Sequence, residues 1–115
     1  MPSGRQALGG HGENLAAHWY EAHGYEVVER NWRVAGGEID LVLRKGHELV
    51  FCEVKTRTSD RFGSPAESVT PAKQRRIRQL AAVYLADLES ARPKLVRFDV
   101  ACVTGREVEV ISQAF

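Results

Sequence analysis

Residues 37–56 read GEIDLVLRKGHELVFCEVKT, two apolar runs separated by Lys-Gly-His. Apolar runs of this length that are bounded by glycine-containing turns are typical of β-strands joined in a hairpin. We therefore expect strands over residues 38–44 and 48–56. Asp40, Glu53 and Lys55 interrupt these runs. Charged side chains are rarely left in buried strands unless they are paired or bind a metal ion, so these three residues are the first candidates for a functional site.

The hairpin also predicts which residues face each other. If residues 46–47 form a two-residue turn, Asp40 lies opposite Glu53, with Cβ atoms about 5 Å apart. Two carboxylates at that range repel each other unless a cation lies between them or one takes a proton. A slip of one residue would place them on opposite faces. The first residues of the strand 48–56 are apolar on both faces, which indicates an inner strand covered on both sides.

The remaining pattern predicts an α/β fold. Helical spacing of apolar residues indicates helices over residues 12–23 and 70–90, the second with Thr70 as N-cap and Pro71 in its first turn. Strands are expected over residues 25–34, 95–103 and 107–112. The result is a single-domain mixed β-sheet flanked by helices, over residues 12–115. The glycine-rich residues 1–11 are expected to be flexible. Asp99 lies on the polar phase of its strand and receives no role.

The length of the chain and the distribution of its charges limit the functions it can have. The chain has 115 residues, 43% of them hydrophobic, which suits one globular domain with one core. The net charge of +1 alone predicts no polyanionic partner, but residues 55–78 hold seven basic residues against two acidic ones. Such a local field attracts nucleic acid, although a solvated helix face is the simpler explanation of this run taken alone. The candidate nucleic-acid contacts are Arg57, Arg61, Lys73, Arg75, Arg76 and Arg78.

The cysteines and the hydropathy pattern indicate the cellular compartment of the protein. Cys52 and Cys102 lie in apolar strand-like runs without a CxxC pair, so we expect both to be reduced and buried, in a cytoplasmic protein. No apolar run approaches the length of a membrane span, and no membrane partner is expected. The first three histidines lack the i, i+4 spacing of a helical zinc site.

The candidate residues suit metal-assisted phosphodiester hydrolysis. Mg²⁺ prefers hard oxygen ligands and is held by only one or two carboxylates. Asp40, Glu53 and the backbone carbonyl of Val54 supply such a set for Mg²⁺ or Mn²⁺. Lys55 would then contact the attacking water or the phosphate, and Glu13 would hold a second ion or orient water.

Each candidate also has a plainer explanation. Glu53 and Lys55 would form a salt bridge along one strand, and Asp40 would be a solvated acid near a turn. Glu13 would be an acid favoured by the dipole at a helix N-terminus.

Seven short motifs together resemble a known family. The chain is similar to the YraN-like bacterial proteins, which are functionally uncharacterised and belong to the PD-(D/E)xK nuclease superfamily near the archaeal Holliday-junction resolvases. The resemblance covers nearly the whole chain. The motifs are Gly12-Glu13, Arg30-Asn31-Trp32-Arg33, Gly37-Glu38-Ile39-Asp40-Leu41, Phe51-Cys52-Glu53-Val54-Lys55-Thr56-Arg57, Phe62-Gly63-Ser64-Pro65-Ala66-Glu67, Lys73-Gln74-Arg75-Arg76-Ile77 and Arg97-Phe98-Asp99-Val100.

The resemblance implies a restriction-endonuclease-like core and a catalytic role for five residues. Asp40, Glu53 and Lys55 match the superfamily motif, Glu13 matches the helix acid of resolvase-type members, and Gln74 loosely matches a supporting polar residue on the next helix. Ile39 replaces the proline that gives the motif its name.

The function expected from the resemblance is a metal-dependent DNA endonuclease that acts on branched or damaged DNA. The alternative is a non-catalytic module, binding nucleic acid or protein, on a nuclease fold. A homodimer is a third alternative, because a four-way junction has two-fold symmetry.

Overall fold

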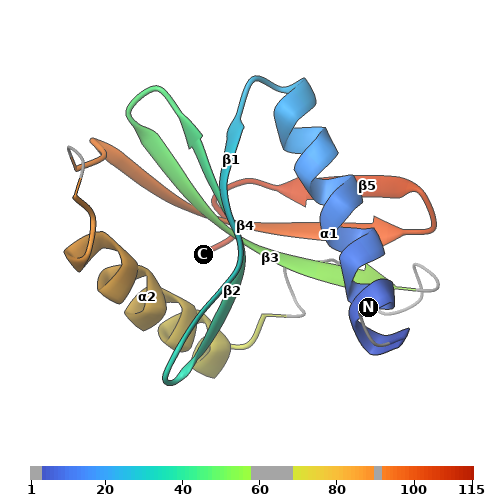
Figure 1. The fold of residues 1–115 in the computed structure, drawn as a ribbon, viewed down its shortest axis with the longest axis horizontal. Helices are drawn as coiled ribbons and strands as arrows, with labels where there is room; N and C mark the ends of the chain where they lie inside the picture. The colour runs from blue at the N-terminus through green and yellow to red at the C-terminus, as the bar shows by residue number, and fades with distance from the viewer. Residues whose placement is uncertain (1–3, 58–68, 90–91) are drawn as a thin grey trace.

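A central strand, β3, organises the fold in a computed structural model (Figure 1). The model describes the backbone of residues 4–57, 69–89 and 92–115, and the side chains from residue 10 onward in these ranges. The sheet order is β1-β2-β3-β4-β5, with β3 and β4 parallel and the other neighbours antiparallel. The elements are α1 (Gly4–Ala22), β1 (Glu26–Val34), β2 (Gly37–Lys45), β3 (Glu48–Arg57), α2 (Pro71–Ala86), β4 (Leu95–Thr104) and β5 (Glu107–Ile111).

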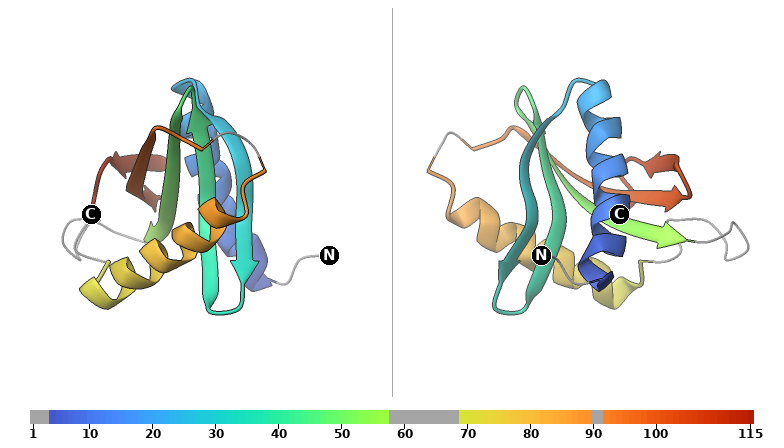
Figure 2. Two further views of the ribbon diagram at one scale, coloured as in Figure 1. Left: turned by 90° about the vertical axis from the view of Figure 1, so that its left-hand side faces the viewer. Right: turned by 45° about the vertical axis from the view of Figure 1, so that its right-hand side comes forward.

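The two helices cover opposite faces of this sheet, as Figure 2 shows, with α2 in front of it and α1 behind it in the left-hand view. The predicted single α/β domain with a mixed sheet flanked by helices is thereby confirmed, and it is consistent with a restriction-endonuclease-like fold. Within the described part of the chain, neither helix combines the length and apolar character that a membrane span requires.

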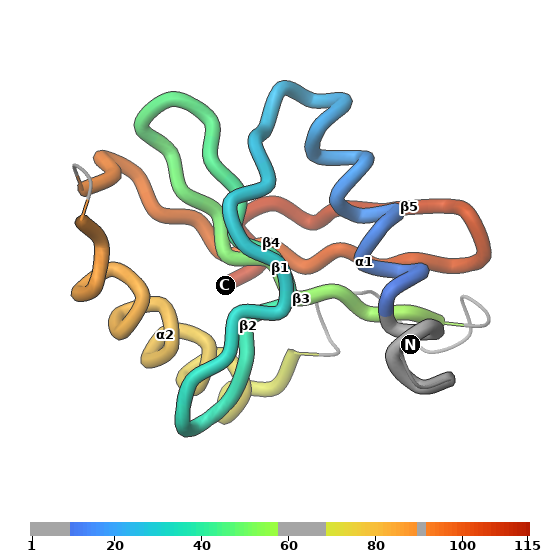
Figure 3. Tube along the Cα trace, viewed as in Figure 1, coloured from blue at the N-terminus to red at the C-terminus, as the bar shows by residue number. Residues whose placement is uncertain are grey.

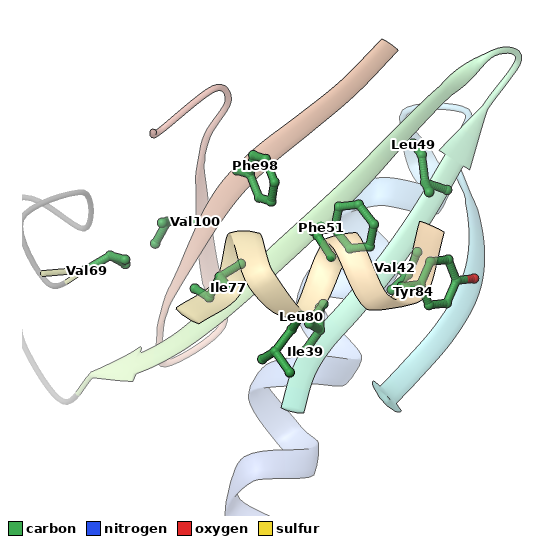
Figure 4. Packing of buried hydrophobic residues seen from close by; sticks show 11 residues of the cluster. Ile39, Val42, Leu49, Phe51, Val69, Ile77, Leu80, Tyr84, Phe98 and Val100 are labelled. Atoms are coloured by element: carbon green, nitrogen blue, oxygen red, sulfur yellow. The ribbon is translucent and has the colours of Figure 1, made fainter. Parts of the chain in front are cut away.

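The residues of β3 alternate between two cores, so the prediction of an inner strand is confirmed. Figure 4 shows Leu49 and Phe51 on the α2 side, where they pack with Ile77, Leu80 and Tyr84 of the helix. On the α1 side, Val50 and Cys52 pack with three residues of the first helix, Ala16, Ala17 and Tyr20. Burying apolar side chains on both faces contributes roughly 1.5–3 kcal/mol per large residue and fixes the position of the strand.

The hairpin between β2 and β3 has the predicted register. Lys45 pairs with Glu48 across the turn, and the pairing continues without a shift to Leu41 and Cys52. There the paired ladder ends, one position before Asp40 and Glu53 would pair. The two acids therefore follow the last pair of the ladder instead of belonging to it.

The helix boundaries differ from those predicted. α1 begins at Gly4, eight residues before the predicted start, and runs through Gly9 and Gly10, which each cost a helix roughly 1 kcal/mol relative to alanine. The flexibility of residues 1–11 stays a prediction. Thr70 is the N-cap of α2 as predicted, with its side chain accepting from the Lys73 amide, but the helix ends at Ala86 instead of residue 90.

A fully buried carboxylate joins α1 to β4. Asp99 is 0% exposed and accepts hydrogen bonds from the Tyr20 hydroxyl at 2.6 Å and from the amide of Gln113 at 3.1 Å. The Arg97 guanidinium donates to both of its oxygens at 2.8 Å. Arg97 also donates to Glu48 at 2.7 Å, which ties the starts of β3 and β4 together. Because a buried charge is tolerated only when paired, this network specifies how α1 sits on the sheet.

Tyr20→Phe is expected to lower the free energy of unfolding by about 1–3 kcal/mol, since it leaves the buried Asp99 one donor short. Burial raises the pKa of the Tyr20 hydroxyl, which keeps it protonated as a donor. Tyr25→Phe is the matched control: its hydroxyl donates to the half-buried Glu48, which retains Arg97, so the loss should be smaller. Urea unfolding at neutral pH measures both, and equal losses would contradict the role given to Asp99.

Candidate functional site

The candidate site lies where β2 and β3 diverge, just beyond their last paired residues (Figure 1). At this fork the amide of Val54 donates to Oδ2 of Asp40 at 2.8 Å instead of to a backbone carbonyl of β2. The N–H and C=O of one strand residue point toward the same neighbouring strand. The Val54 carbonyl therefore faces the Asp40 side of the fork as well.

Asp40 lies in a strongly anionic environment. Burial, followed by the charge of Glu53, raises the pKa of Asp40 to about 7, and the charge of Glu13 contributes in the same direction. The hydrogen bond from Val54 acts in the opposite direction without cancelling these effects. The sequence predicted that the carboxylates of Asp40 and Glu53 repel each other. The contribution of Glu53 to the raised pKa of Asp40 agrees with that repulsion.

Two lysines contact a single oxygen of Glu53. Lys55, two residues further along β3, lies 3.4 Å from Oε1 of Glu53, and Lys73 of α2 lies 2.6 Å from the same atom. The Glu53 side chain is only 11% exposed, so both ion pairs are partly shielded from water. The strand salt bridge that the sequence offered as the plainer explanation is thus present, but the closer partner of Glu53 comes from another element. We refer to Asp40, Glu53, Lys55 and Lys73 as the acid–lysine cluster.

The pKa values of the two lysines shift in opposite directions. Burial, together with the neighbouring Lys73, lowers the pKa of Lys55. Burial would also lower the pKa of Lys73, but its contact with Glu53 outweighs that effect and the pKa lies above its ordinary value. Lys73 is accordingly the principal counter-ion of Glu53.

Glu13 reaches this end of the sheet from α1. It is buried, and its Oε2 accepts a hydrogen bond of 2.7 Å from the side-chain amide of Asn31. Since α1 begins at Gly4, Glu13 lies well inside the helix, and its explanation as a helix N-terminal acid is wrong.

Asn31, which the sequence argument did not single out, positions Glu13. It has a left-handed backbone with φ of 52° and lies in β1 between Arg30 and Trp32, whose partners Leu41 and Ile39 flank Asp40 in β2. Asparagine tolerates this conformation better than most residues, and its occurrence inside a strand, where it is disfavoured, was the available signal.

Close packing between α1 and β3 brings Glu13 to the site. Gly12 lies against Thr56, so closely that a Cβ atom on Gly12 would collide with the Thr56 hydroxyl. Figure 3 shows α1 passing the end of β3. The glycine is required here for close approach, since any side chain would push the helix, and Glu13 with it, away from the strand.

The residues at the fork suit a hard divalent cation. Among the residues that the structure describes, no three His, Cys, Asp or Glu side chains gather into a metal-binding group. Mg²⁺ needs only one or two carboxylates, and Asp40, Glu53 and the Val54 carbonyl provide oxygen donors alone. Burial and the charge of Glu53 raise the pKa of Asp40, and a divalent cation bound there would favour its ionised form.

The other predicted site residues lie at varying distances from this cluster. Gln74 donates to the carbonyl of Val69 at 3.0 Å, a contact that supports the start of α2. Arg76 lies beside Gly37, the first residue of β2, and Arg75 is exposed on α2. Arg57 ends β3, and Arg61 lies outside the described residues.

The Arg78 side chain packs against aromatic rings. Its guanidinium stacks over the rings of Phe98, at 4.8 Å, and Phe115, at 5.6 Å. Such cation–π contacts stabilise by about 0.5–1 kcal/mol at exposed sites. Arg78 therefore joins α2 to the C-terminal end of the chain, away from the cluster that holds Lys73.

Fold and site together define a small α/β protein with an acid–lysine cluster at a strand fork. The chain belongs to the uncharacterised protein family UPF0102, whose sequence model matches residues 12–103. This confirms the resemblance to the YraN-like bacterial proteins.

Relatives match over most of their length. A UPF0102 protein of Beutenbergia cavernae is 54% identical over 99 residues, covering 86% of this chain and 83% of the relative. A relative from Frankia alni is 53% identical over 100 residues, covering 87% and 82%. One from Acidothermus cellulolyticus is 42% identical over 127 residues, covering 98% and 96%.

Gly12→Ala is expected to destabilise the fold by about 1–3 kcal/mol, because the added methyl group overpacks the contact between α1 and Thr56. Thr56→Ala should cost little by itself, since Thr56 is exposed. The double variant should lose less unfolding free energy than the sum of the two single losses, by at least about 1 kcal/mol. Chemical denaturation of all four proteins measures this coupling, and strict additivity would contradict the close contact.

Proposed function

We propose that this protein is a Mg²⁺- or Mn²⁺-dependent DNA endonuclease of the PD-(D/E)xK superfamily, similar to the archaeal Holliday-junction resolvases. The proposal is supported above all by one observation: at the strand fork Asp40 accepts a hydrogen bond from the Val54 amide, and the neighbouring Glu53 has two lysines beside one of its oxygens. A protein stabilised only by packing has no need of two neighbouring acids, one of which, Asp40, has its pKa raised by burial and by the charge of the other.

The proposed chemistry divides among the cluster residues. Asp40, Glu53 and the Val54 carbonyl would hold the divalent ion, which when bound neutralises the scissile phosphate and assists deprotonation of water. Lys55, whose pKa is lowered by burial, lies next to Glu53 and is suited to orient the attacking water and exchange a proton with it. Glu13, held by Asn31, would orient water from the α1 side.

The basic residues near the cluster would bind the DNA backbone. Lys73, Arg75 and Arg76 lie in the first turns of α2, and Arg57 lies at the end of β3, so they flank the acids on two elements. Branched or damaged DNA is the proposed substrate, and cleavage of a four-way junction would require a homodimer with two sites. We propose the cytoplasm as the location.

The second candidate is a non-catalytic module, binding nucleic acid or protein, on the same fold. It is favoured by the ion pairs themselves, because Glu53 is already neutralised by Lys55 and Lys73 without any metal. A module of this kind that binds DNA would do so with affinity that falls steeply with salt, and it would leave the DNA intact.

Asp40→Ala is expected to weaken Mn²⁺ binding at least tenfold, since it removes one of two carboxylate ligands. Calorimetric titration of Mn²⁺ into the protein with a nicked four-way DNA junction present measures the affinity, and DNA alone provides the blank. Asp87→Ala, an exposed acid at the C-cap of α2, is the matched control and should bind as wild type does. Equal binding by wild type and Asp40→Ala, or none by either, would refute the metal site.

Glu53→Gln is expected to keep the fold and lower the rate of DNA cleavage by about 100-fold or more, beyond the loss typical of outer-shell metal partners. Mg²⁺-dependent cleavage of branched and linear DNA is the assay, with circular dichroism to verify folding. Glu109→Gln on β5 is an exposed control that should cleave normally. Unchanged cleavage by Glu53→Gln would remove this residue from the site, and intact binding without cleavage by wild type would favour the module.

A further inference from the structure

Lys73 occupies a position that its local surroundings disfavour. It is the third residue of α2, where its backbone amide donates to the N-cap oxygen of Thr70 at 3.2 Å. The first turn of α2 contains no acidic residue. A helix N-terminus carries a partial positive charge, so an ammonium group there is destabilised unless an anion compensates for it. Glu53 of β3 supplies that anion at 2.6 Å.

The same oxygen of Glu53 also faces Lys55. Two ammonium groups around one carboxylate oxygen repel each other, and they are held together only by the negative charge between them. Of the two, Lys55 is fixed by its place on the central strand, whereas Lys73 reaches across from the end of a helix on a flexible four-carbon stem. Lys73 is thus the partner that can leave without moving the backbone.

We propose that Lys73 is an exchangeable counter-ion: it neutralises Glu53 in the metal-free protein, gives up that oxygen to the divalent cation, and then binds the DNA phosphate. This inference rests on the proposed function, since it needs the metal site at Asp40 and Glu53. It adds that Lys73 and the cation compete for the same oxygen of Glu53. It also gives Lys73 two alternative anionic partners, a carboxylate and a phosphate.

The exchange links metal binding to DNA binding. A phosphate near the N-terminus of α2 attracts Lys73 away from Glu53, and this frees the carboxylate for the cation. By thermodynamic linkage, bound cation strengthens DNA binding by the same factor. The freed ammonium would otherwise remain at a positive helix end without a partner, so each ligand favours the other.

Lys73→Met is expected to bind Mn²⁺ about five- to tenfold more tightly than wild type in the absence of DNA, within the usual range of coupling between sites. Lys94→Met removes the same charge at the start of β4 and should leave the affinity within twofold of wild type. Calorimetry with Mn²⁺ alone at two salt concentrations separates the direct competition from long-range repulsion, which salt screens. Unchanged or weaker Mn²⁺ binding by Lys73→Met would overturn the exchange.

A second measurement uses the wild-type protein and does not depend on the variant's folding. In protein carrying ¹³C-labelled lysine, the Cε signal of Lys73 should shift on titration with Mg²⁺ and saturate with the metal, and Asp40→Ala should abolish the shift. A Lys73 signal that does not respond while Mg²⁺ binds would overturn the exchange but leave the metal site standing. Failure of the wild type to bind either ion would overturn the proposed function itself.

Discussion

The hydrogen bond from the Val54 amide to the Asp40 carboxylate is the contact on which the site depends. It replaces the next backbone hydrogen bond of the β2–β3 ladder, so the two strands separate without leaving a buried amide unpaired. In doing so it fixes an acid at the opening and turns the Val54 carbonyl to the same side. Glu53 precedes Val54 on β3, and Lys73 of α2 pairs with its side chain. A regular ladder continued by one more pair would have closed this space.

The carboxylates at the two ends of β3 have different cationic partners. At its start, Glu48 and the buried Asp99 are both satisfied by Arg97, whose fork-shaped guanidinium matches a carboxylate with two parallel hydrogen bonds. At its far end, Glu53 is paired with two lysines, and burial together with the charge of Glu53 raises the pKa of Asp40. Arginine at the first end fixes α1 to the sheet. A lysine ammonium group is a point charge on a flexible stem, so under the proposed exchange the acids at the second end could change partners.

The sequence predicted those features that depend on local pattern. Alternation along residues 48–56 predicted the inner strand, an assumed two-residue turn at 46–47 predicted the hairpin register, and Thr70-Pro71 marked the start of α2. It did not predict the pairing of Lys73 with Glu53, because that contact joins a helix to a strand through tertiary packing and leaves no local spacing. Asp99 received no role for the same reason, since its partners Tyr20 and Gln113 are remote in the chain.

The charges of the acid–lysine cluster explain the order in which ligands would bind. Lys55 and Lys73 both pair with Glu53, and Asp40 acts on Lys73 through its charge, so two carboxylates lie near two ammonium groups in the metal-free cluster. A divalent cation added to this group creates an excess of positive charge that water only partly screens at half-buried positions. A phosphodiester backbone removes that excess, which is why cation and nucleic acid should bind together more readily than either alone. Under the proposed function, balanced charges in the free protein would favour a cation that binds together with a phosphate.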